Sequence, residues 1–257
     1  MKNTMTIEEI KAKYPYLYET HLHTNESSAC GHNSGAEMAK AHKDAGYTGI
    51  IVTDHNWGGY TAVDRELPWS EWIDKFFAGF RNAKAEGDKI GLQVFCGYEA
   101  GYGGPEFLIY GLDPEWMKEH EELKTATPAE QYVLVSGAGG MVIQAHPYRE
   151  EWYIEEIKLY PDDVDGCEAV NATHSNSKST SHNNPDFDVR AIAYAKEHDF
   201  CTTAGSDIHS VNALGGGVAF PTKLTDIYDF INRVKNKEDY VLTNGEHWYT
   251  RTGDLIL

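Results

Sequence analysis

Short motifs that combine histidines with carboxylates recur along the first 210 residues of the chain. They are His21-Leu-His23, Thr53-Asp54-His55, Glu99, His146-Pro147, His174 and Asp207-Ile-His209. Neutral imidazoles and carboxylates are ligands for zinc, manganese and iron. Side chains that are two residues apart on a strand, as in His21-Leu-His23, lie on the same face and can bind one ion together. A lone carboxylate such as Glu99 can bridge two ions, and ions about 3.5–4 Å apart can bind both the attacking and the leaving oxygen of a phosphoryl transfer. The motifs therefore predict a cluster of divalent metals.

Each motif lies at or just beyond the end of a segment with the composition of a β-strand. We predict strands near residues 17–22, 49–53, 92–98, 107–111, 141–145, 167–171 and 201–205. Several are continuous apolar runs, which is typical of strands covered on both faces. Helical patterns alternate with them, so we expect an α/β fold with a mainly parallel sheet. Polar groups at the end of strand after strand favour a barrel, because barrel strands point their last residues at one mouth.

The helices are indicated by their caps and by apolar spacing. Capping boxes at Ser34–Glu37 and Thr127–Glu130 predict two helix starts. An apolar stripe over 69–80 and the segments 186–198 and 227–234 predict three more helices. His42, His120, His198 and His247 fall on helices or late segments, and we expect them to be ordinary surface histidines.

Three basic residues are candidates for binding an anionic substrate. Arg149 lies three residues beyond His146, on the loop that leaves a motif-bearing strand. A guanidinium matches phosphate oxygens with two parallel hydrogen bonds, so Arg149 is the first candidate. The competing interpretation is an exposed arginine that pairs with Glu150 or Glu151. Arg190 and Lys178, which flank the loop around His174, are weaker candidates.

Composition limits the class of protein. The chain has 257 residues and a formal net charge of −18, which disfavours strong nucleic-acid binding. A small anionic substrate remains compatible, because bound divalent cations add local positive charge. No apolar run reaches the length of a membrane span, and the N-terminus lacks the pattern of a secretory signal. Four widely spaced cysteines are typical of reduced thiols, so we expect a cytoplasmic protein. Nothing in the sequence predicts the oligomeric state.

The ordered motifs resemble those of the PHP (polymerase and histidinol phosphatase) domain. The resemblance rests on His21-Leu-His23-Thr, Thr53-Asp-His55, Glu99, Ala145-His146-Pro, His174 and Gly205-Ser-Asp207-Ile-His209, and it extends from about residue 16 to 210. It implies a distorted seven-stranded (β/α) TIM-like barrel with three metals at its mouth. We therefore expect one domain over residues 1–257, with its core at about 16–235.

The resemblance also implies how the ligands are shared. His21, His23, Glu99 and Asp207 would bind one metal, and Glu99, His146 and His174 a second. His55 and His209 would bind the third, together with a residue from the loop after the first strand. His32 is our first choice there, with Glu26 and Cys30 as alternatives. His182 is an alternative to His174, and Asp54 would orient a ligand or touch bound water.

These features predict a metal-dependent phosphoesterase that holds two or three divalent ions of zinc, manganese or iron. Metal-bound hydroxide would attack a small phosphate ester, with Asp54 and Arg149 as catalytic groups. One alternative is an amidohydrolase-like enzyme acting on a non-phosphate substrate, although the strand-five lysine typical of those barrels is not evident. Another alternative is a metal-binding domain without catalytic activity.

Overall fold

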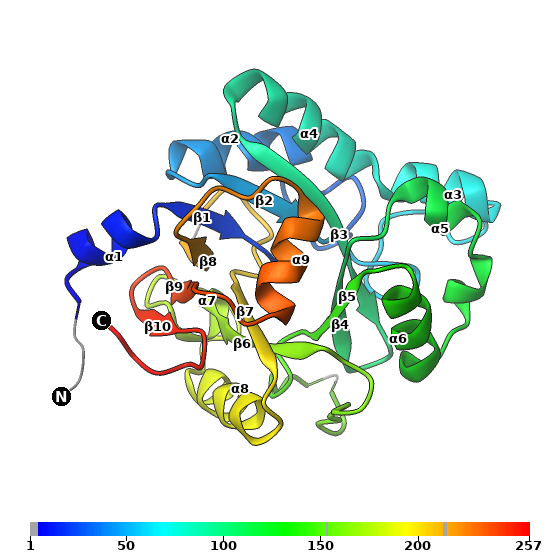
Figure 1. Ribbon diagram of the computed structural model, residues 1–257. Helices are drawn as coiled ribbons and strands as arrows, with labels where there is room; N and C mark the ends of the chain where they lie inside the picture. The colour runs from blue at the N-terminus through cyan, green and yellow to red at the C-terminus, as the bar shows by residue number, and fades with distance from the viewer. Residues whose placement is uncertain (1–4, 153, 213–214) are drawn as a thin grey trace.

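The computed structural model describes residues 5–152, 154–212 and 215–257 of the chain. Residues 1–4, part of the segment that lacks a secretory pattern, lie outside the described residues. Ten strands of the described part form one curled sheet in the order β10-β9-β8-β1-β2-β3-β4-β5-β6-β7 (Figure 1). The strands are β1 (Tyr16–Glu19), β2 (Gly49–Val52), β3 (Gln93–Gly101), β4 (Glu106–Tyr110), β5 (Met141–Gln144), β6 (Gly166–Asn171), β7 (Cys201–Gly205), β8 (Gly216–Phe220), β9 (Val241–Asn244) and β10 (Trp248–Thr250).

The predicted α/β, TIM-like fold class is confirmed. All seven predicted strands are present, and β1–β2–β3 and β5–β6–β7 pair in parallel. The sheet differs from a regular barrel because β4 is antiparallel to both β3 and β5. Three unpredicted strands, β8, β9 and β10, extend the sheet by antiparallel pairing beside β1. A Cβ added at Gly216 of β8 would lie 2.9 Å from the Gly205 carbonyl oxygen of β7, so the two flanks of the curled sheet come close together.

Helices lie around the outside of the curled sheet, and α9 lies across its centre (Figure 1). They are α1 (Ile7–Lys13), α2 (Gly35–Asp44), α3 (Trp69–Phe76), α4 (Ala78–Ile90), α5 (Pro114–Lys118), α6 (Pro128–Gly137), α7 (Ala172–Ser175), α8 (Asp186–Glu197) and α9 (Ile227–Lys235), with a 3₁₀ turn at Glu121–Lys124. Both predicted capping boxes form, at Ser34 and at Thr127. The apolar stripe over 69–80 spans two helices, because the chain leaves helical geometry at Phe77. No helix in these described ranges is both long and apolar enough to cross a membrane.

An aromatic core closes the end of the barrel opposite the polar motifs. Phe230 of α9 packs on Tyr110 and Phe220, with ring centroids 5.3 and 6.2 Å apart. Tyr18 packs on the same Phe220 ring at 6.0 Å. The Tyr110 hydroxyl donates a hydrogen bond of 2.9 Å to the carbonyl oxygen of Thr20, the residue before His21. Close-packed rings therefore support the backbone from which the first two histidines project.

The expectation that His42 is a surface residue is wrong. Its ring is fully buried on the inner face of α2, against Tyr47, and its Nδ1 donates to the Met38 carbonyl oxygen at 2.8 Å. Within the described residues its Nε2 has no hydrogen-bond partner. Burial lowers the pKa of His42 to about 4, because a charged ring would lose its hydration in this position.

This burial predicts a pH-dependent loss of stability. The unfolded ring has a pKa of about 6.5, so between about pH 6.5 and pH 4 the unfolded chain binds a proton that the folded chain does not. With metals removed by a chelator, the free energy of unfolding should therefore fall as pH decreases through this window. His42 should contribute at most about 3 kcal/mol to this fall. Urea denaturation of wild type and His42→Gln at several pH values measures the difference. Equal pH slopes for the two proteins would refute the assignment.

Candidate metal centre

The first two histidines lie side by side just beyond β1. His21 and His23 are fully buried, and their ring centroids are 5.2 Å apart. Both Nε2 atoms face Asp207, at 3.4 Å for His21 and 3.0 Å for His23. A parallel bridge between Leu22 and Ile208 holds the two chain segments in this register. The structure thus brings together three of the residues that were predicted to share one metal.

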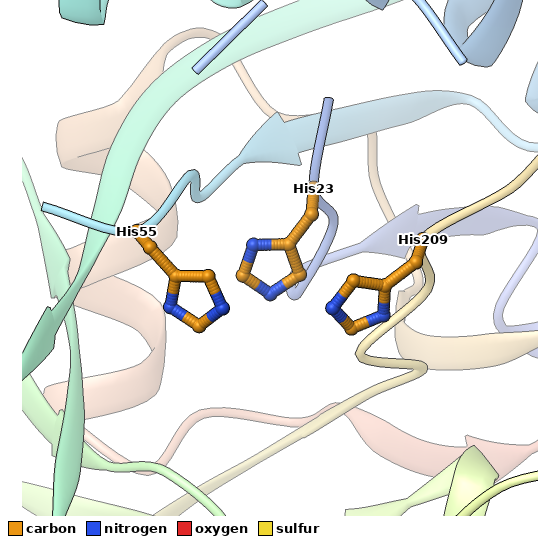
Figure 2. Close-up of side chains that lie close together, drawn as sticks. All are labelled: His23, His55 and His209. Carbon is orange, nitrogen blue, oxygen red and sulfur yellow. The ribbon is translucent and has the colours of Figure 1, made fainter. Parts of the chain in front are cut away.

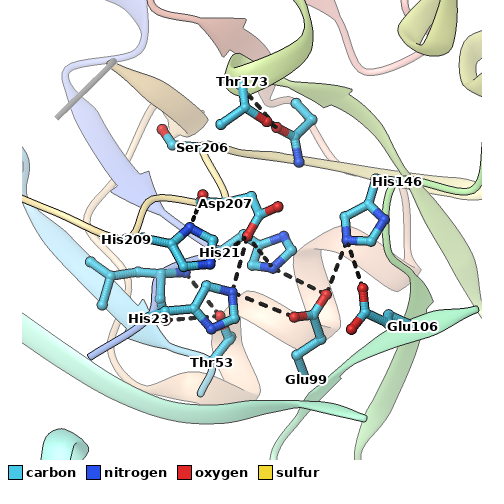
Figure 3. A network of polar contacts seen from close by, with 12 residues as sticks. His21, His23, Thr53, Glu99, Glu106, His146, Thr173, Ser206, Asp207 and His209 are labelled. Atoms are coloured by element: carbon cyan, nitrogen blue, oxygen red, sulfur yellow. Dashed lines mark hydrogen bonds and ion pairs between the residues drawn. The ribbon is translucent and has the colours of Figure 1, made fainter. Parts of the chain in front are cut away.

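Glu99, near the end of β3, lies at the centre of the cluster (Figure 3). Its Oε1 is 3.3 Å from His21 Nε2 and 3.1 Å from His146 Nε2. Its Oε2 is 3.0 Å from His55 Nδ1 and 3.4 Å from His23 Nε2. One carboxylate therefore faces four imidazoles with two oxygens, which is the arrangement expected of a ligand shared between ions.

A third group consists of the rings of His23, His55 and His209 (Figure 2). The His23 ring lies between the other two, with centroids 4.4 Å from His55 and 4.5 Å from His209. One ring nitrogen from each residue lies within 4.8 Å of the other two. This group and the His21–His23–Asp207 group share His23, so the candidate ligand sets are contiguous.

The outer nitrogens of these rings are held by other groups. His21 Nδ1 lies 3.0 Å from the buried Glu168 carboxylate, and His23 Nδ1 lies 3.3 Å from the Ser28 hydroxyl. His209 Nδ1 lies 2.9 Å from the Asp207 carbonyl oxygen. Metal-binding histidines characteristically donate their second ring nitrogen in this way, which fixes the tautomer and leaves Nε2 for the ion. The donor set therefore fits divalent metals.

Two of the candidate ligands have a positive backbone φ, which residues other than glycine rarely adopt. His146 has a φ of 26° and Asp207 a φ of 50°. Non-glycine residues at positive φ carry strain of about 1–3 kcal/mol, which persists where the surrounding structure enforces it. Here His146 N donates to Glu168, and Asp207 is fixed by His23 and Arg149. The strained backbone therefore belongs to two residues that the predicted metal binding needs.

Asp54 supports the loop between β1 and α2 and lies behind the histidines. It accepts hydrogen bonds from the Thr24 amide and hydroxyl at 2.6 and 2.7 Å and from the Ser28 hydroxyl at 2.6 Å. Ser28 in turn accepts from the His55 amide at 3.0 Å and touches His23. Burial raises the pKa of Asp54 to about 6, against the lowering effect of these hydrogen bonds. Its geometry suits orienting the ligands more than moving a substrate proton.

Two predicted ligands lie outside these groups of candidate metal-binding side chains. His174 Nδ1 lies 2.8 Å from Asp188 Oδ1, and its Nε2 accepts a 3.0 Å hydrogen bond from Arg149. His32 contacts the site through its backbone, whose amide donates to the His209 carbonyl oxygen at 2.8 Å, and its side chain lines the neighbouring cavity with Lys178. The alternative His182 pairs with Glu151 instead.

The loop after β1 places Cys30 in the lining of a cavity that His55 and His209 also line. Glu26 turns away, because its carboxylate accepts from the Gly35 amide at the start of α2 and from Asn82. Burial alone would raise the pKa of Cys30, but hydrogen bonds with His209 and His55 outweigh it, and the pKa of the thiol is lowered. Residue types in the loop did not reveal which side chain faces inward.

The three basic candidates have different surroundings. Arg149 is buried: its Nη1 is 2.6 Å from Asp207 Oδ2, and its Nη2 donates to Thr173 at 3.3 Å. The competing interpretation, an exposed arginine paired with Glu150 or Glu151, is therefore wrong. Arg190 pairs with Glu150 and Asp186 at 2.8 and 3.1 Å, on the outside of the barrel. Lys178 lines a cavity of about 420 Å³ together with Asp207 and His209.

Two glutamates in the site, the buried Glu168 and the partly buried Glu106, were not recognised from the sequence. Glu168 lies inside a predicted strand. A charged residue within an otherwise apolar run could have indicated that it belongs to the site. Glu106 opens β4 and faces His55 and His146. A cavity of about 530 Å³ opens over the cluster, and its lining includes Glu99, Glu106, Arg149, Asp207 and His209, with Tyr60 and Trp152 as aromatic members. That volume suits a small organic molecule.

Comparison with known proteins supports the fold. Residues 189–238, which include Asp207 and His209, match the family model described as PHP-associated. The PHP resemblance is confirmed for this segment and for the fold. A two-domain protein from Bacteroides vulgatus, named as containing a predicted PHP-like metal-dependent phosphoesterase, superposes with a TM-score of 0.63 at 14% identity, over 95% of this chain and 68% of its own.

Two further solved structures have the same fold. A proposed metal-dependent phosphoesterase from Bifidobacterium adolescentis superposes with a TM-score of 0.52 at 15% identity, covering 86% of this chain and 96% of its own. PsfC from Pseudomonas syringae superposes with a TM-score of 0.53 at 17% identity, covering 84% and 87%. No curated protein sequence matches the chain.

Proposed function

We propose that this protein hydrolyses a small phosphate ester at a centre of two or three divalent metals. The observation that carries the proposal is the position of Glu99, whose two oxygens face His21, His23, His55 and His146 within 3.4 Å. The names of the PHP-like structural neighbours support the reaction class. The cavity of about 530 Å³ supports a small substrate.

The proposed ligands follow the clusters. His21, His23, Glu99 and Asp207 hold one ion, Glu99 and His146 a second, and His55 and His209 with Cys30 a third. His174 would complete the second set only without the hydrogen bond that its Nε2 accepts from Arg149. When bound, the ions supply hydroxide from water at neutral pH and offset negative charge on the phosphoryl group. Among zinc, manganese and iron, a thiolate ligand favours zinc or iron at the third position.

Arg149 has a second role in this proposal. Without ions, its guanidinium balances the charge of Asp207, which lies 2.6 Å away. Burial lowers the pKa of Arg149, but the Asp207 carboxylate outweighs this effect, so the pKa is raised. His21 and His23 would hold an ion on the Oδ1 side of Asp207, whereas Arg149 contacts Oδ2, and the positive charge of the ion would weaken the hold of Asp207 on the guanidinium. Arg149 also lines the cavity, so it can then donate to the phosphate oxygens of a substrate.

Metal content and activity test the function together. Protein loaded separately with manganese, zinc or iron should hold at least two ions by elemental analysis and release phosphate from members of a panel of phosphate mono- and diesters. His146→Ala and Asp207→Ala should remove nearly all of this activity while the fold survives by circular dichroism, because both residues face Glu99 or the histidines.

Other outcomes separate the alternatives. Turnover of amides or lactones without phosphate release would indicate an amidohydrolase-like enzyme. Full metal loading without turnover of either panel would indicate a metal-binding domain, and one ion or none per chain in every metal would exclude the multinuclear centre.

Arg149→Ala should lower kcat/KM about ten- to a hundred-fold and leave metal content unchanged. The reason is the loss of a charged hydrogen bond worth roughly 1.5–3 kcal/mol. Arg149→Lys should recover part of the loss, since lysine keeps the charge without the two-pronged geometry. Arg190→Ala is the matched control, because Arg190 pairs with Glu150 and Asp186. Wild-type kcat/KM in Arg149→Ala would show that Arg149 does not bind substrate.

Cobalt substitution should identify the third-site ligand from the loop after β1. A thiolate bound to Co²⁺ gives a near-ultraviolet charge-transfer band that imidazole and carboxylate ligands do not give. We expect this band in the cobalt-loaded wild type and in His32→Ala, and its loss in Cys30→Ser, since Cys30 contacts His55 and His209. If the wild type lacks the band, Cys30 is not a ligand.

A further inference from the structure

Glu106 occupies a defined place on the same sheet face as Glu99. It is the first residue of β4, which returns antiparallel to β3 through the turn at 102–105. In the β3–β4 register Glu99 is opposite Leu108, and Glu106 is opposite Gly101. Paired residues of an antiparallel ladder share a face, so the two glutamates are diagonal neighbours on one face. Gly101 has no side chain, which leaves room for Glu106 to lean toward the cluster.

The two carboxylates address the same pair of histidines. Glu106 Oε1 lies 3.6 Å from His55 Nδ1, and its Oε2 lies 3.5 Å from His146 Nε2. Glu99 approaches the same two nitrogens with separate oxygens, at 3.0 and 3.1 Å. Figure 3 shows His146 in contact with both carboxylates. Each glutamate thus spans the positions of His55 and His146.

This pair of carboxylates is a candidate binding site for a cation. The Glu106 side chain is 20% exposed and, within the described ranges, forms no ion pair with a lysine or arginine. Two largely buried carboxylates repel one another unless positive charge lies between them. Ligand atoms of His55, Glu99 and Glu106 all lie within 4.8 Å of one another, close enough for one ion to contact all three.

We propose that Glu106 is a metal ligand, shared between the ions bound at His55 and at His146. The inference rests on the proposed function only in that the centre binds divalent cations. The resemblance to PHP domains implied one shared carboxylate, Glu99, whereas this chain supplies two. Carboxylate oxygens are better ligands for manganese than for softer metals. The second carboxylate therefore raises the affinity for manganese at these two positions.

Glu106→Gln tests the proposal, because it keeps the size of the side chain and removes its charge. Wild type, Glu106→Gln, Glu106→Asp and the control Glu156→Gln are titrated with Mn²⁺ by calorimetry, and bound manganese is followed by electron paramagnetic resonance. Glu156 is an exposed carboxylate that lines a cavity beside Glu106, so its variant matches the loss of charge.

We expect wild type and Glu156→Gln to bind at least two ions and to give the multiline spectrum of spin-coupled manganese. Glu106→Gln should lose one ion, or bind it at least about ten-fold more weakly, and its spin-coupled signal should be weaker than that of wild type. Glu106→Asp should restore part of the affinity, which also shows that the site tolerates substitution.

Equal stoichiometry and affinity in wild type and Glu106→Gln would overturn the role of Glu106 while leaving the metal centre intact. A wild type that binds one ion or none would overturn both proposals. Loss of one ion in Glu106→Gln, together with a wild type that hydrolyses no phosphate ester, would support Glu106 as a ligand and reject the proposed function alone.

Discussion

The burial of several carboxylates among imidazoles is the constraint on which the rest of the structure depends. Glu99 and Asp207 are almost fully buried, and together they contact His21, His23, His55 and His146. Charges removed from water need partners of opposite charge at hydrogen-bonding distance, since an unpaired buried charge is strongly destabilising. The surrounding chain therefore serves to fix orientation: Glu168 and Ser28 hold the outer ring nitrogens, and the hydroxyl of Tyr110 ties this layer to the aromatic core below.

The sequence was informative where position along a strand decides the outcome. Strand ends put His21, Glu99, His146 and Asp207 at one mouth, because a barrel directs the carboxyl ends of its strands to one side. This reasoning did not identify Glu106. Strand β4 is antiparallel to β3, so its amino end, where Glu106 lies, is the end at the mouth. Residue types in the loop after β1 also could not decide between His32, Glu26 and Cys30, since backbone turns determine which side chain faces inward.

Helical pattern and exposure are separate questions, as His42 illustrates. Helix α2 was predicted from its capping box, yet the buried side of a helix depends on what packs against it, and the ring lies against Tyr47. The strands β8, β9 and β10 were missed for a related reason. They pair antiparallel beside β1, and Gly215, Gly216 and Gly217, which precede or begin β8, have a composition more typical of turns.

The formal charge of −18 bears on which substrates the proposed function could use. An acidic surface repels extended polyanions, whose binding depends on many phosphate contacts at once. A single phosphoryl group needs only local positive charge, and fields from nearby cations dominate at short range. Arg149 is buried among Asp207, His174 and Thr173 in the described structure, so it adds positive charge inside the cavity and little outside it. In the proposed function, an acidic exterior would therefore disfavour long nucleic acids, while bound cations and Arg149 would provide the local positive charge that a small phosphate ester needs.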